Sequence, residues 1–368
     1  MKTVVITDGK YRSAISAARS LGRAGLHVVV TQTRGDTKTE PPVFSSRYVA
    51  ATHWIEGAAS DTEYPARLRA VLETYDRPVL FCVGAASLNA VSRARTVLEP
   101  CCDMLIAPPQ VLDALNDKAA VHARALELGL PVPKEYSGAP NTFPVVVKPH
   151  CGEKFGLKAA DRYRIARSAA EYESALAALK PYDPEPIVQE YVSGEGRGVS
   201  LLLDREGRLV SALCHRRIRE YPISGGPSAC CESIYDPELI DRACRLLQSF
   251  GFVGLAMVEF KGDRILEVNP RVWGSFPLTT CAGSPMAAKY CAAASGSPAA
   301  YTPQDYTVGV KMRFLLNDTL AVLKLFLAGR FRETISGVAD VFRAKEALTD
   351  REDPKPFRRY LKTTILGK

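Results

Sequence analysis

Short apolar runs alternate with amphipathic segments at the start of the chain. Residues 3–7 (Thr-Val-Val-Ile-Thr) are followed by an amphipathic segment near Ser13–Ala24, then by Gly25 and a second apolar run at His27–Thr31. Runs of β-branched residues favour buried strands, and the segment between them favours a helix that Gly25 ends. This order predicts a βαβ unit and therefore a parallel sheet.

The same pattern continues to about residue 106. Val79–Val83 is an apolar run that predicts another buried strand, and Leu105–Ala107 predicts a short one before two prolines. The motif GxGxxG is absent, so a dinucleotide-binding fingerprint is not supported. Together these elements predict an N-terminal doubly wound parallel-sheet α/β domain over residues 1–106.

Residues 107–300 mix helical and strand patterns without an internal repeat. The predicted elements are helices at Pro109–Leu115 and Lys118–Leu128, a strand at Phe143–Lys148, a helix at Glu171–Leu179, strands at Ile187–Tyr191, Val199–Asp204 and Leu209–Arg217, and helices at Pro237–Phe250 and Pro285–Ala294. Asn116 or Asp117 can cap the second helix. We divide this part into two α+β subdomains, residues 107–186 and 187–300, at the linker 181–186.

The last part of the chain, residues 301–368, is basic and predicted to be mainly helical. Leu320–Leu327 and Val338–Leu348 have helical patterns, and Lys324 alone interrupts the apolar residues of the first. The simpler interpretation is a helical extension that packs on the preceding domain. The alternative is an element that binds a membrane surface, an anionic polymer or another partner, because its surroundings are basic.

Most of the excess positive charge of the chain lies in this extension. The chain has a net charge of +8, and residues 311–368 contain 13 Lys or Arg against 7 Asp or Glu, a net charge of +6. The remainder is nearly neutral, so no broad nucleic-acid-binding face is expected.

Other features of the composition indicate an ordinary globular protein. An apolar fraction of 46% and a charged fraction of 24% exclude disordered and fibrous classes, and 368 residues predict two or three domains. The chain has ten cysteines, and no two of them have the CxxC spacing. This favours buried thiols in a reducing cytoplasm. Neither a signal peptide nor an apolar run of membrane-spanning length is apparent.

The segment Met257–Arg271 reads as a β-hairpin whose strands carry two carboxylates, Glu259 and Glu267, and the Asn269 carboxamide. Glu267 and Asn269 are two residues apart and share one face of a strand. Glu259 joins them if the loop has an odd residue count, with a bulge at Gly262 or Asp263; a two-residue loop would place it on the opposite face. Hard oxygen donors without His or Cys suit Mg²⁺, so this face predicts a magnesium site.

Three further features precede the hairpin in a consistent order. Lys118 begins a helix, Lys148 ends the strand Val145–Lys148, and Gln189-Glu190-Tyr191-Val192 ends another strand before a glycine-containing turn. A lysine after three valines at a strand end points out of a buried sheet, towards a functional edge.

In the order and spacing of these motifs the chain resembles the ATP-grasp superfamily of ligases over about residues 1–300. The resemblance rests on Asp117-Lys118, Val145-Val146-Val147-Lys148-Pro149, Gln189-Glu190-Tyr191-Val192 and Glu267-Val268-Asn269-Pro270-Arg271. It extends to single-chain relatives of the carbamoyl-phosphate synthase large subunit, including D-aspartate ligase and pyrrolysine-pathway amino-acid ligases. It implies an ATP-grasp fold, in which two α+β subdomains clamp ATP.

The resemblance also implies roles in nucleotide binding. Lys118 and Lys148 would contact the ATP phosphates, and the segment from Cys151 to Lys158 would form a flap over them. The residues implied for the rest of the nucleotide are Gly152 and Gly156 in the flap, Gln189, Glu190, Tyr191 and Val192 in the adenine hinge, and Glu195 at the ribose. Glu190 could serve at the ribose in place of Glu195, and the sequence does not choose between them.

The remaining implied roles belong to the metal and the reacting groups. Glu259, Glu267 and Asn269 would bind one or two Mg²⁺, with Mn²⁺ as a possible substitute. Arg271 would stabilise an acyl-phosphate or the departing phosphate, and Arg216 or Arg217 would hold a substrate carboxylate or phosphate. A surface cluster is an equal alternative for either arginine.

The function implied is an ATP-dependent carboxylate–amine ligase that forms an amide through an acyl-phosphate, with an amino acid as a substrate. The partners expected are therefore a small-molecule carboxylate and an amine, and a homodimer is the default assembly. One rival is a bicarbonate-using carboxylase or carbamoyl-phosphate-type enzyme. Another is a non-catalytic ATP-binding regulatory protein, which the retained metal-binding and lysine residues disfavour.

Overall fold

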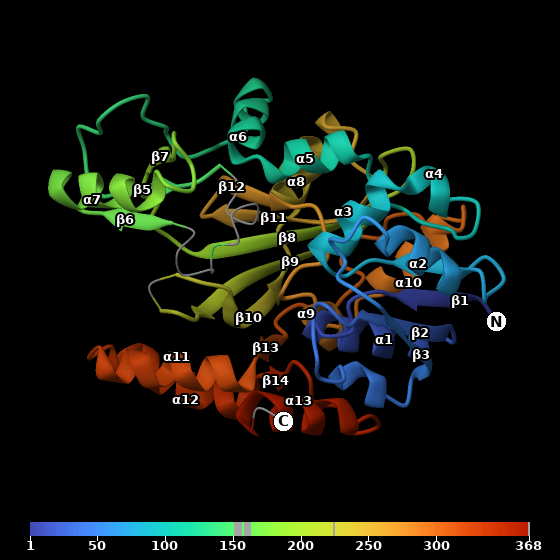
Figure 1. Ribbon diagram of the computed structural model, residues 1–368. Coiled ribbons are helices and arrows are strands. Elements are labelled where there is room, and N and C mark those ends of the chain that lie inside the picture. Colours follow the sequence, from blue (N-terminus) through green and yellow to red (C-terminus); the bar gives the residue numbers. More distant parts are fainter. Residues whose placement is uncertain (151–156, 158–162, 224, 367–368) are drawn as a thin grey trace.

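The computed structural model describes residues 1–150, 157, 163–223 and 225–366, and its strands form three sheets (Figure 1). The N-terminal sheet has the order β3-β2-β1-β4, with all pairs parallel. Its strands are β1 (Thr3–Ile6), β2 (His27–Thr33), β3 (Val49–Ile55) and β4 (Val79–Phe81). The helices of this part are α1 (Arg12–Arg23), η1 (Pro42–Ser45), α2 (Tyr64–Leu72), α3 (Ala85–Arg93) and α4 (Arg95–Leu98).

Two details differ from the sequence predictions for this sheet. Leu105–Ala107 is buried but is not a strand, and its neighbour Asp103 forms only an isolated parallel bridge with Val79. The edge strand β3 was not predicted, because it includes the exposed Thr52 and the half-buried His53 and Trp54 and lacks a continuous apolar run. The predicted parallel doubly wound character is confirmed.

A small antiparallel sheet follows, with the order β6-β5-β7. It is reached through α5 (Pro109–Asn116) and α6 (Lys118–Glu127), contains β5 (Val145–Lys148), β6 (Arg164–Ala166) and β7 (Ile187–Glu190), and is packed by α7 (Ala169–Leu179). It has a core of its own, made by Val145, Val147, Ala166 and Tyr172 with a few neighbours. The sheet ends with β7, so we propose placing the subdomain boundary after β7 instead of at residue 186.

The largest sheet has seven strands in the order β12-β11-β8-β9-β10-β13-β14. The strands are β8 (Gly196–Leu203), β9 (Leu209–Glu220), β10 (Ser228–Ile234), β11 (Gly254–Lys261), β12 (Arg264–Asn269), β13 (Lys311–Arg313) and β14 (Lys345–Glu346). Helices α8 (Pro237–Ser249), α9 (Pro277–Cys281) and α10 (Met286–Ala294) accompany it. Its core is continuous with that of the N-terminal sheet; for example, the rings of Phe81 and Tyr290 meet edge to face with centroids 4.9 Å apart.

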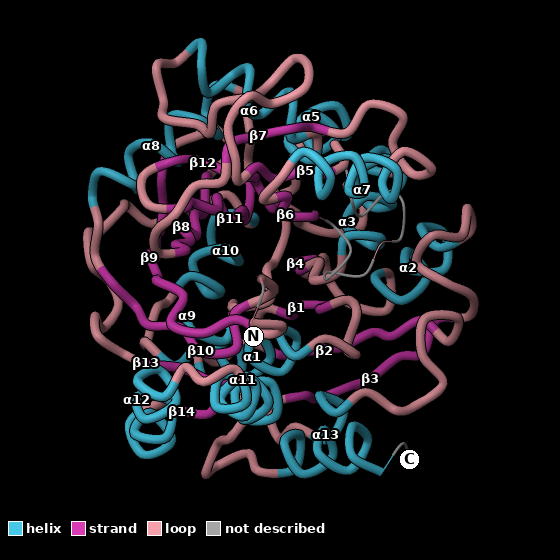
Figure 2. Tube along the Cα trace, turned by 90° about the vertical axis from the view of Figure 1, so that its left-hand side faces the viewer, coloured by secondary structure: helices cyan, strands magenta, loops and turns pink. Residues whose placement is uncertain are grey.

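The C-terminal part contains α11 (Leu315–Leu327), α12 (Phe331–Arg343) and α13 (Lys355–Leu366). It is mainly helical, as predicted, but β13 and β14 also add two short strands to the large sheet. The predicted helix Val338–Leu348 therefore ends early, because Lys345 and Glu346 pair with β13. Figures 1 and 2 place α11, α12 and α13 along the lower side of the molecule.

Candidate active site

The hairpin β11–β12 places its two carboxylates directly opposite each other. Glu259 pairs with Glu267, whereas Phe260 pairs with Ile265, so Leu266 is an extra residue in β12. The loop itself has only two residues, Gly262 and Asp263, because Lys261 pairs with Arg264. The expectation that a two-residue loop separates the carboxylates is wrong, since the bulge lies within the strand and restores the shared face.

Basic side chains surround these carboxylates. Arg217 Nη2 lies 2.5 Å from Glu259 Oε2, and Lys118 Nζ lies 3.2 Å from Glu267 Oε2. The Asn269 amide donates to Glu259 Oε1 over 3.2 Å, so the three oxygen-bearing side chains converge. Two carboxylates facing across a ladder repel each other, and the cations offset this repulsion.

The two carboxyl groups are electrostatically distinct. Burial raises the pKa of Glu259, Arg217 opposes the rise, and Glu267 adds to it, which leaves that pKa above its ordinary value. Burial also raises the pKa of Glu267, but Lys118 and Lys148 outweigh burial and hold it below its ordinary value. Glu267 is thus held as a carboxylate before any metal arrives.

Lys148 lies deep at the end of β5 and faces the hairpin. Its residue is only 8% exposed, and burial lowers the pKa of its ammonium from 10.5 to about 8, partly opposed by Glu267. Nearby Lys118 also lowers this pKa. The ammonium groups of Lys118 and Lys148 therefore lie close enough to repel each other, which favours a bound anion.

Local structure fixes both lysines. The Asp117 carboxylate caps α6 by accepting from the backbone of Ala119 at 2.9 Å, which fixes the helix start at Lys118. The Lys118 N–H donates to the His150 carbonyl at 3.3 Å, so the ends of β5 and α6 are joined. His150 in turn bonds Asp183 through its backbone N–H and through Nδ1, over 2.8 and 2.9 Å.

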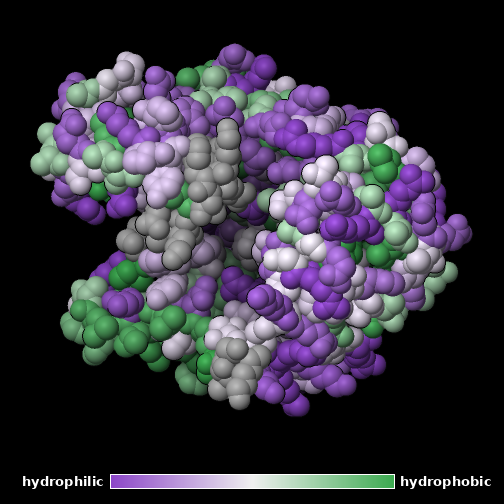
Figure 3. Space-filling view, viewed as in Figure 1, coloured by the Kyte–Doolittle hydropathy of each residue, from purple (hydrophilic) through white to green (hydrophobic). Residues whose placement is uncertain are grey.

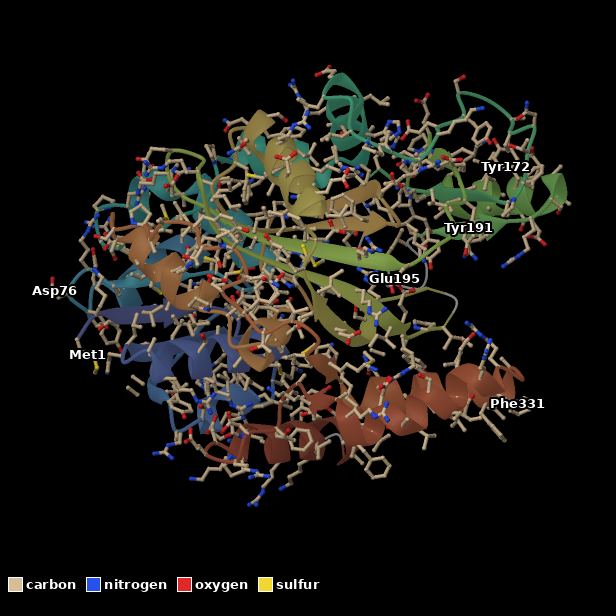
Figure 4. All side chains as sticks on the ribbon, turned by 180° about the vertical axis from the view of Figure 1, so that it is seen from behind. Met1, Asp76, Tyr172, Tyr191, Glu195 and Phe331 are labelled. Atoms are coloured by element: carbon tan, nitrogen blue, oxygen red, sulfur yellow. The ribbon has the colours of Figure 1, made fainter. Side chains whose placement is uncertain are left out.

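The predicted adenine hinge connects the small and large sheets. The Glu190 N–H donates to the Lys134 carbonyl at 2.9 Å, and the Tyr191 N–H donates to the Pro144 carbonyl at 3.1 Å. The buried Gln189 amide donates to Glu135 at 2.8 Å. Figure 4 shows Tyr191 and Glu195 in the part of the chain that joins the two sheets.

Both candidate ribose ligands are ion-paired. Glu190 pairs with Arg264, and Glu195 pairs with Arg197 and Arg216 at 3.2 and 3.3 Å. Each carboxylate therefore has a fixed orientation, and the choice between them stays open.

A second bulge separates two arginines of β9. Cys231 pairs with Arg217 and Cys230 with Arg219, so Ile218 is an extra residue. Arg217 therefore faces Glu259, whereas Arg219 faces the opposite side of the sheet and bonds α11. Burial lowers the pKa of Arg217, but Glu259 and Glu220 outweigh it and hold this pKa above its ordinary value.

Arg271 follows β12 and is half-buried; its Nη1 donates to the Val272 carbonyl over 3.1 Å. His215 is fully buried, and burial together with Arg217 lowers the pKa of its imidazole to about 3, so it is neutral. The predicted flap glycines, Gly152 and Gly156, lie outside the described residues.

Sequence reasoning missed two acidic residues of this site. Glu135 contacts Gln189 and raises the pKa of Lys148, and Glu220 lies 3.4 Å from Arg217. Glu135 lies in a connector after Pro133 with no pattern around it, and Glu220 lies in a charged run that reads as solvent-exposed. Only the fold brings them to the site.

The residues present fit a magnesium ion. The described residues contain no group of three His, Cys, Asp or Glu side chains that could hold a metal. The candidate set instead combines two carboxylates with the Asn269 carboxamide, the hard oxygen donors that Mg²⁺ prefers when phosphate oxygens complete its shell.

A family model described as an ATP-grasp domain matches residues 115–275. This range includes Lys118, Lys148, the hinge and the acidic hairpin. The match identifies an ATP-grasp domain over these residues, and the fold of the solved structures described next agrees with it.

Solved structures of similar fold include enzymes of two kinds. One is biotin carboxylase from Campylobacter jejuni in a β,γ-ATP complex. It is 15% identical to this chain, with a TM-score of 0.62, and the match covers 84% of this chain and 74% of that one. The biotin carboxylase domain of 2-oxoglutarate carboxylase from Hydrogenobacter thermophilus, a dimer with MgADP, ADP and bicarbonate, is 13% identical with a TM-score of 0.63, over 84% and 73%. L-amino acid ligase from Bacillus licheniformis is 14% identical with a TM-score of 0.58, over 80% and 74%.

Proposed function

We propose that this protein is an ATP-dependent carboxylate–amine ligase with an amino acid among its substrates. The observation that supports this most is the convergence of Lys118 and Lys148 on the Glu267 carboxylate, which lies opposite Glu259 in the hairpin. Two adjacent ammonium groups beside hard oxygen donors suit a triphosphate with its metal. The fold similarity to an L-amino acid ligase agrees with this reaction class.

The proposed chemistry uses the chain mainly to position reactants and neutralise charge. A substrate carboxylate oxygen attacks the γ-phosphorus of ATP, ADP leaves, and an acyl-phosphate forms. The amine then attacks the acyl carbon, phosphate leaves, and the amine loses a proton to give the amide. Lys118 and Lys148 would bind phosphate oxygens throughout, and Arg217 or Arg271 would hold the substrate carboxylate or the departing phosphate.

Magnesium, when bound by Glu259, Glu267 and Asn269, would neutralise phosphate charge. Lys118, which contacts Glu267 in the structure, would bind a phosphate oxygen beside these residues. The backbone of Glu190 to Val192 would orient the adenine, and Glu190 or Glu195 would hold the ribose.

The test is release of ADP and phosphate across a panel of amino-acid pairs. A pair that gives stoichiometric ADP, phosphate and amide supports the proposal. Glu267→Gln should lower kcat/KM by roughly a hundredfold and raise the Mg²⁺ concentration needed for ATP binding, as loss of a metal ligand does. The matched control is Glu238→Gln, which removes an exposed carboxylate of α8 and should change neither. Unchanged magnesium dependence in Glu267→Gln would contradict the assigned metal site.

A second candidate, a bicarbonate-using carboxylase, is favoured by the fold similarity to biotin carboxylases, one of them bound to bicarbonate. ADP release that requires bicarbonate, without any other carboxylate, would identify it. ATP binding with no turnover under any of these conditions would favour a regulatory protein instead.

A further inference from the structure

Helices α11 and α12 form a hairpin whose polarity is inverted. Its inner face carries two buried carboxylates, Asp318 and Asp340, which are 0% and 2% exposed. Its outer face exposes large apolar side chains. Helices that cover a protein core normally do the reverse.

Ion pairs hold the inner face to the large sheet. Arg219 donates to both Asp318 oxygens at 2.7 and 3.1 Å and to Asp340 at 2.8 Å. Lys311 of β13 adds a 2.8 Å pair with Asp340. The two helices also approach each other closely at Gly337, where an added Cβ would come within 2.5 Å of Val322. The hairpin is therefore fixed in the orientation that leaves its apolar face outside.

The apolar face is a continuous feature of both helices. Its members are Leu320, Leu323, Phe326 and Leu327 on α11, and Phe331, Ile335, Val338, Val341 and Phe342 on α12. Leu320, Leu323 and Leu327 follow one helical stripe, and Phe331, Ile335, Val338 and Phe342 follow another. Phe342 is 87% exposed and Ile335 is 70% exposed, so these side chains have no cover within the described chain.

The figures show where this face lies. The rings of Phe326 and Phe331 meet at the turn of the hairpin, with centroids 5.9 Å apart. Phe331 marks the end of the hairpin farthest from the N-terminal sheet (Figure 4). In Figure 3 the hairpin is a green apolar area below a hollow, across from the domain that carries α7. A patch of this extent marks an interaction surface.

The surroundings of the apolar face are strongly basic. Between residues 320 and 365 the exposed charged side chains are nine basic ones, Lys324, Arg330, Arg332, Arg343, Lys345, Arg351, Lys355, Arg358 and Lys362, and two acidic ones, Glu333 and Glu352. Three of the basic residues lie on α13, which runs along the same lower side of the molecule as the hairpin in Figures 1 and 2.

We propose that the apolar face of α11 and α12 docks on an anionic phospholipid bilayer. Apolar side chains would enter the boundary between headgroups and acyl chains, while the basic residues of the hairpin and α13 would contact lipid phosphates. The attachment is peripheral, because no helix of the described residues is long and apolar enough to cross a membrane. This inference does not depend on the proposed ligase activity.

Charge distinguishes a bilayer from a second copy of the chain. A two-fold dimer through this face would bring one basic rim against another, which costs free energy, whereas an anionic bilayer complements it. A soluble anionic polymer would satisfy the basic residues but would leave the apolar side chains in water.

The test is co-sedimentation of the full chain with phosphatidylcholine vesicles, with and without phosphatidylglycerol. Binding is expected only with the anionic lipid and should weaken as salt rises. Phe331→Glu combined with Phe342→Glu should reduce partitioning by roughly a hundredfold, because two apolar contacts are replaced by anions. Arg332→Gln should reduce it about fivefold. The matched control, Leu126→Glu, alters a side chain that is 58% exposed on α6 and should bind normally.

The other outcomes overturn the proposal. Equal binding to vesicles with and without phosphatidylglycerol would show that the basic residues do not contribute to lipid binding. Binding that the double phenylalanine variant retains would identify a purely ionic contact. Absence of vesicle binding, with self-association that the double variant abolishes, would identify a second copy as the occupant. Urea unfolding midpoints equal to that of the unmodified protein would establish that the variants are folded, so each result decides the question.

Discussion

Replacing Lys148 with methionine should stabilise the protein while abolishing nucleotide binding. Methionine keeps an apolar stem of similar length, so the packing around β5 is largely retained. What is lost is an ammonium buried beside Lys118, whose charge Glu267 only partly compensates. Lys148, which we propose binds ATP phosphates, therefore lowers the free energy of unfolding when ATP is absent.

The magnitude follows from the pKa of Lys148. Folding lowers it from 10.5 to about 8, and each pH unit corresponds to about 1.4 kcal/mol. At pH 7 the ammonium therefore reduces the free energy of unfolding by about 3 kcal/mol, and Lys148→Met should recover up to that amount. A substitution that increases stability by this much while destroying binding is rare among point mutations.

The pH dependence provides a sharper test of the same reasoning. Below pH 8 both states of Lys148 are protonated, and the folded protein bears the full cost. Between about 8 and 10.5 the folded lysine is neutral while the unfolded one still binds a proton, so stability rises with pH across this window. Above 10.5 both are neutral and the cost is gone.

Urea unfolding at pH 7 and at pH 9.5 measures this effect. The advantage of Lys148→Met over the unmodified protein should be largest at pH 7 and should shrink at pH 9.5. Lys180→Met, which changes an exposed lysine after α7, is the control and should have no such advantage. If the unmodified protein is the more stable at pH 7, Lys148 is stabilised by its surroundings and the reasoning is refuted.

Two other substitutions test the packing against the large sheet. Arg219→Met leaves Asp318 and Asp340 buried without their main partner and should lower the free energy of unfolding by about 3–5 kcal/mol, measured by urea unfolding, whereas a loss below 1 kcal/mol would show that the pair is solvated. Gly198→Ala would place a Cβ about 2.3 Å from the His215 ring and should cost about 1–3 kcal/mol, with a lower Tm by calorimetry; an unchanged Tm would mean that the ring moves aside freely.

Patterns of apolar residues predicted the strands and helices that contain continuous apolar runs and missed those that do not. The apolar runs of β5 and β8 were predictable, whereas the half-exposed edge strand β3 and the three-residue strand β13 offer too few apolar positions. In the site, the direction of Lys148 and the shared face of Glu267 and Asn269 could be predicted from strand geometry. Glu135 could not, since a connector has no period that aims its side chains.

The two strand bulges show why register is the hardest feature to read from sequence. Simple alternation puts Arg217 and Arg219 on one face, and it separates Glu259 from Glu267 across a two-residue loop. The extra residues Ile218 and Leu266 reverse both results, although neither residue type signals a bulge.

Because of the bulge at Ile218, the two faces of β9 make different contacts. On one face of β9, Arg217 pairs with the proposed metal ligand Glu259; on the other, Arg219 fastens the inverted hairpin through Asp318. The hairpin and the candidate active site are therefore joined by a rigid strand instead of a linker. A bilayer bound by the hairpin would hold the hollow of Figure 3 at a fixed position relative to the lipid surface, without any change in the site itself.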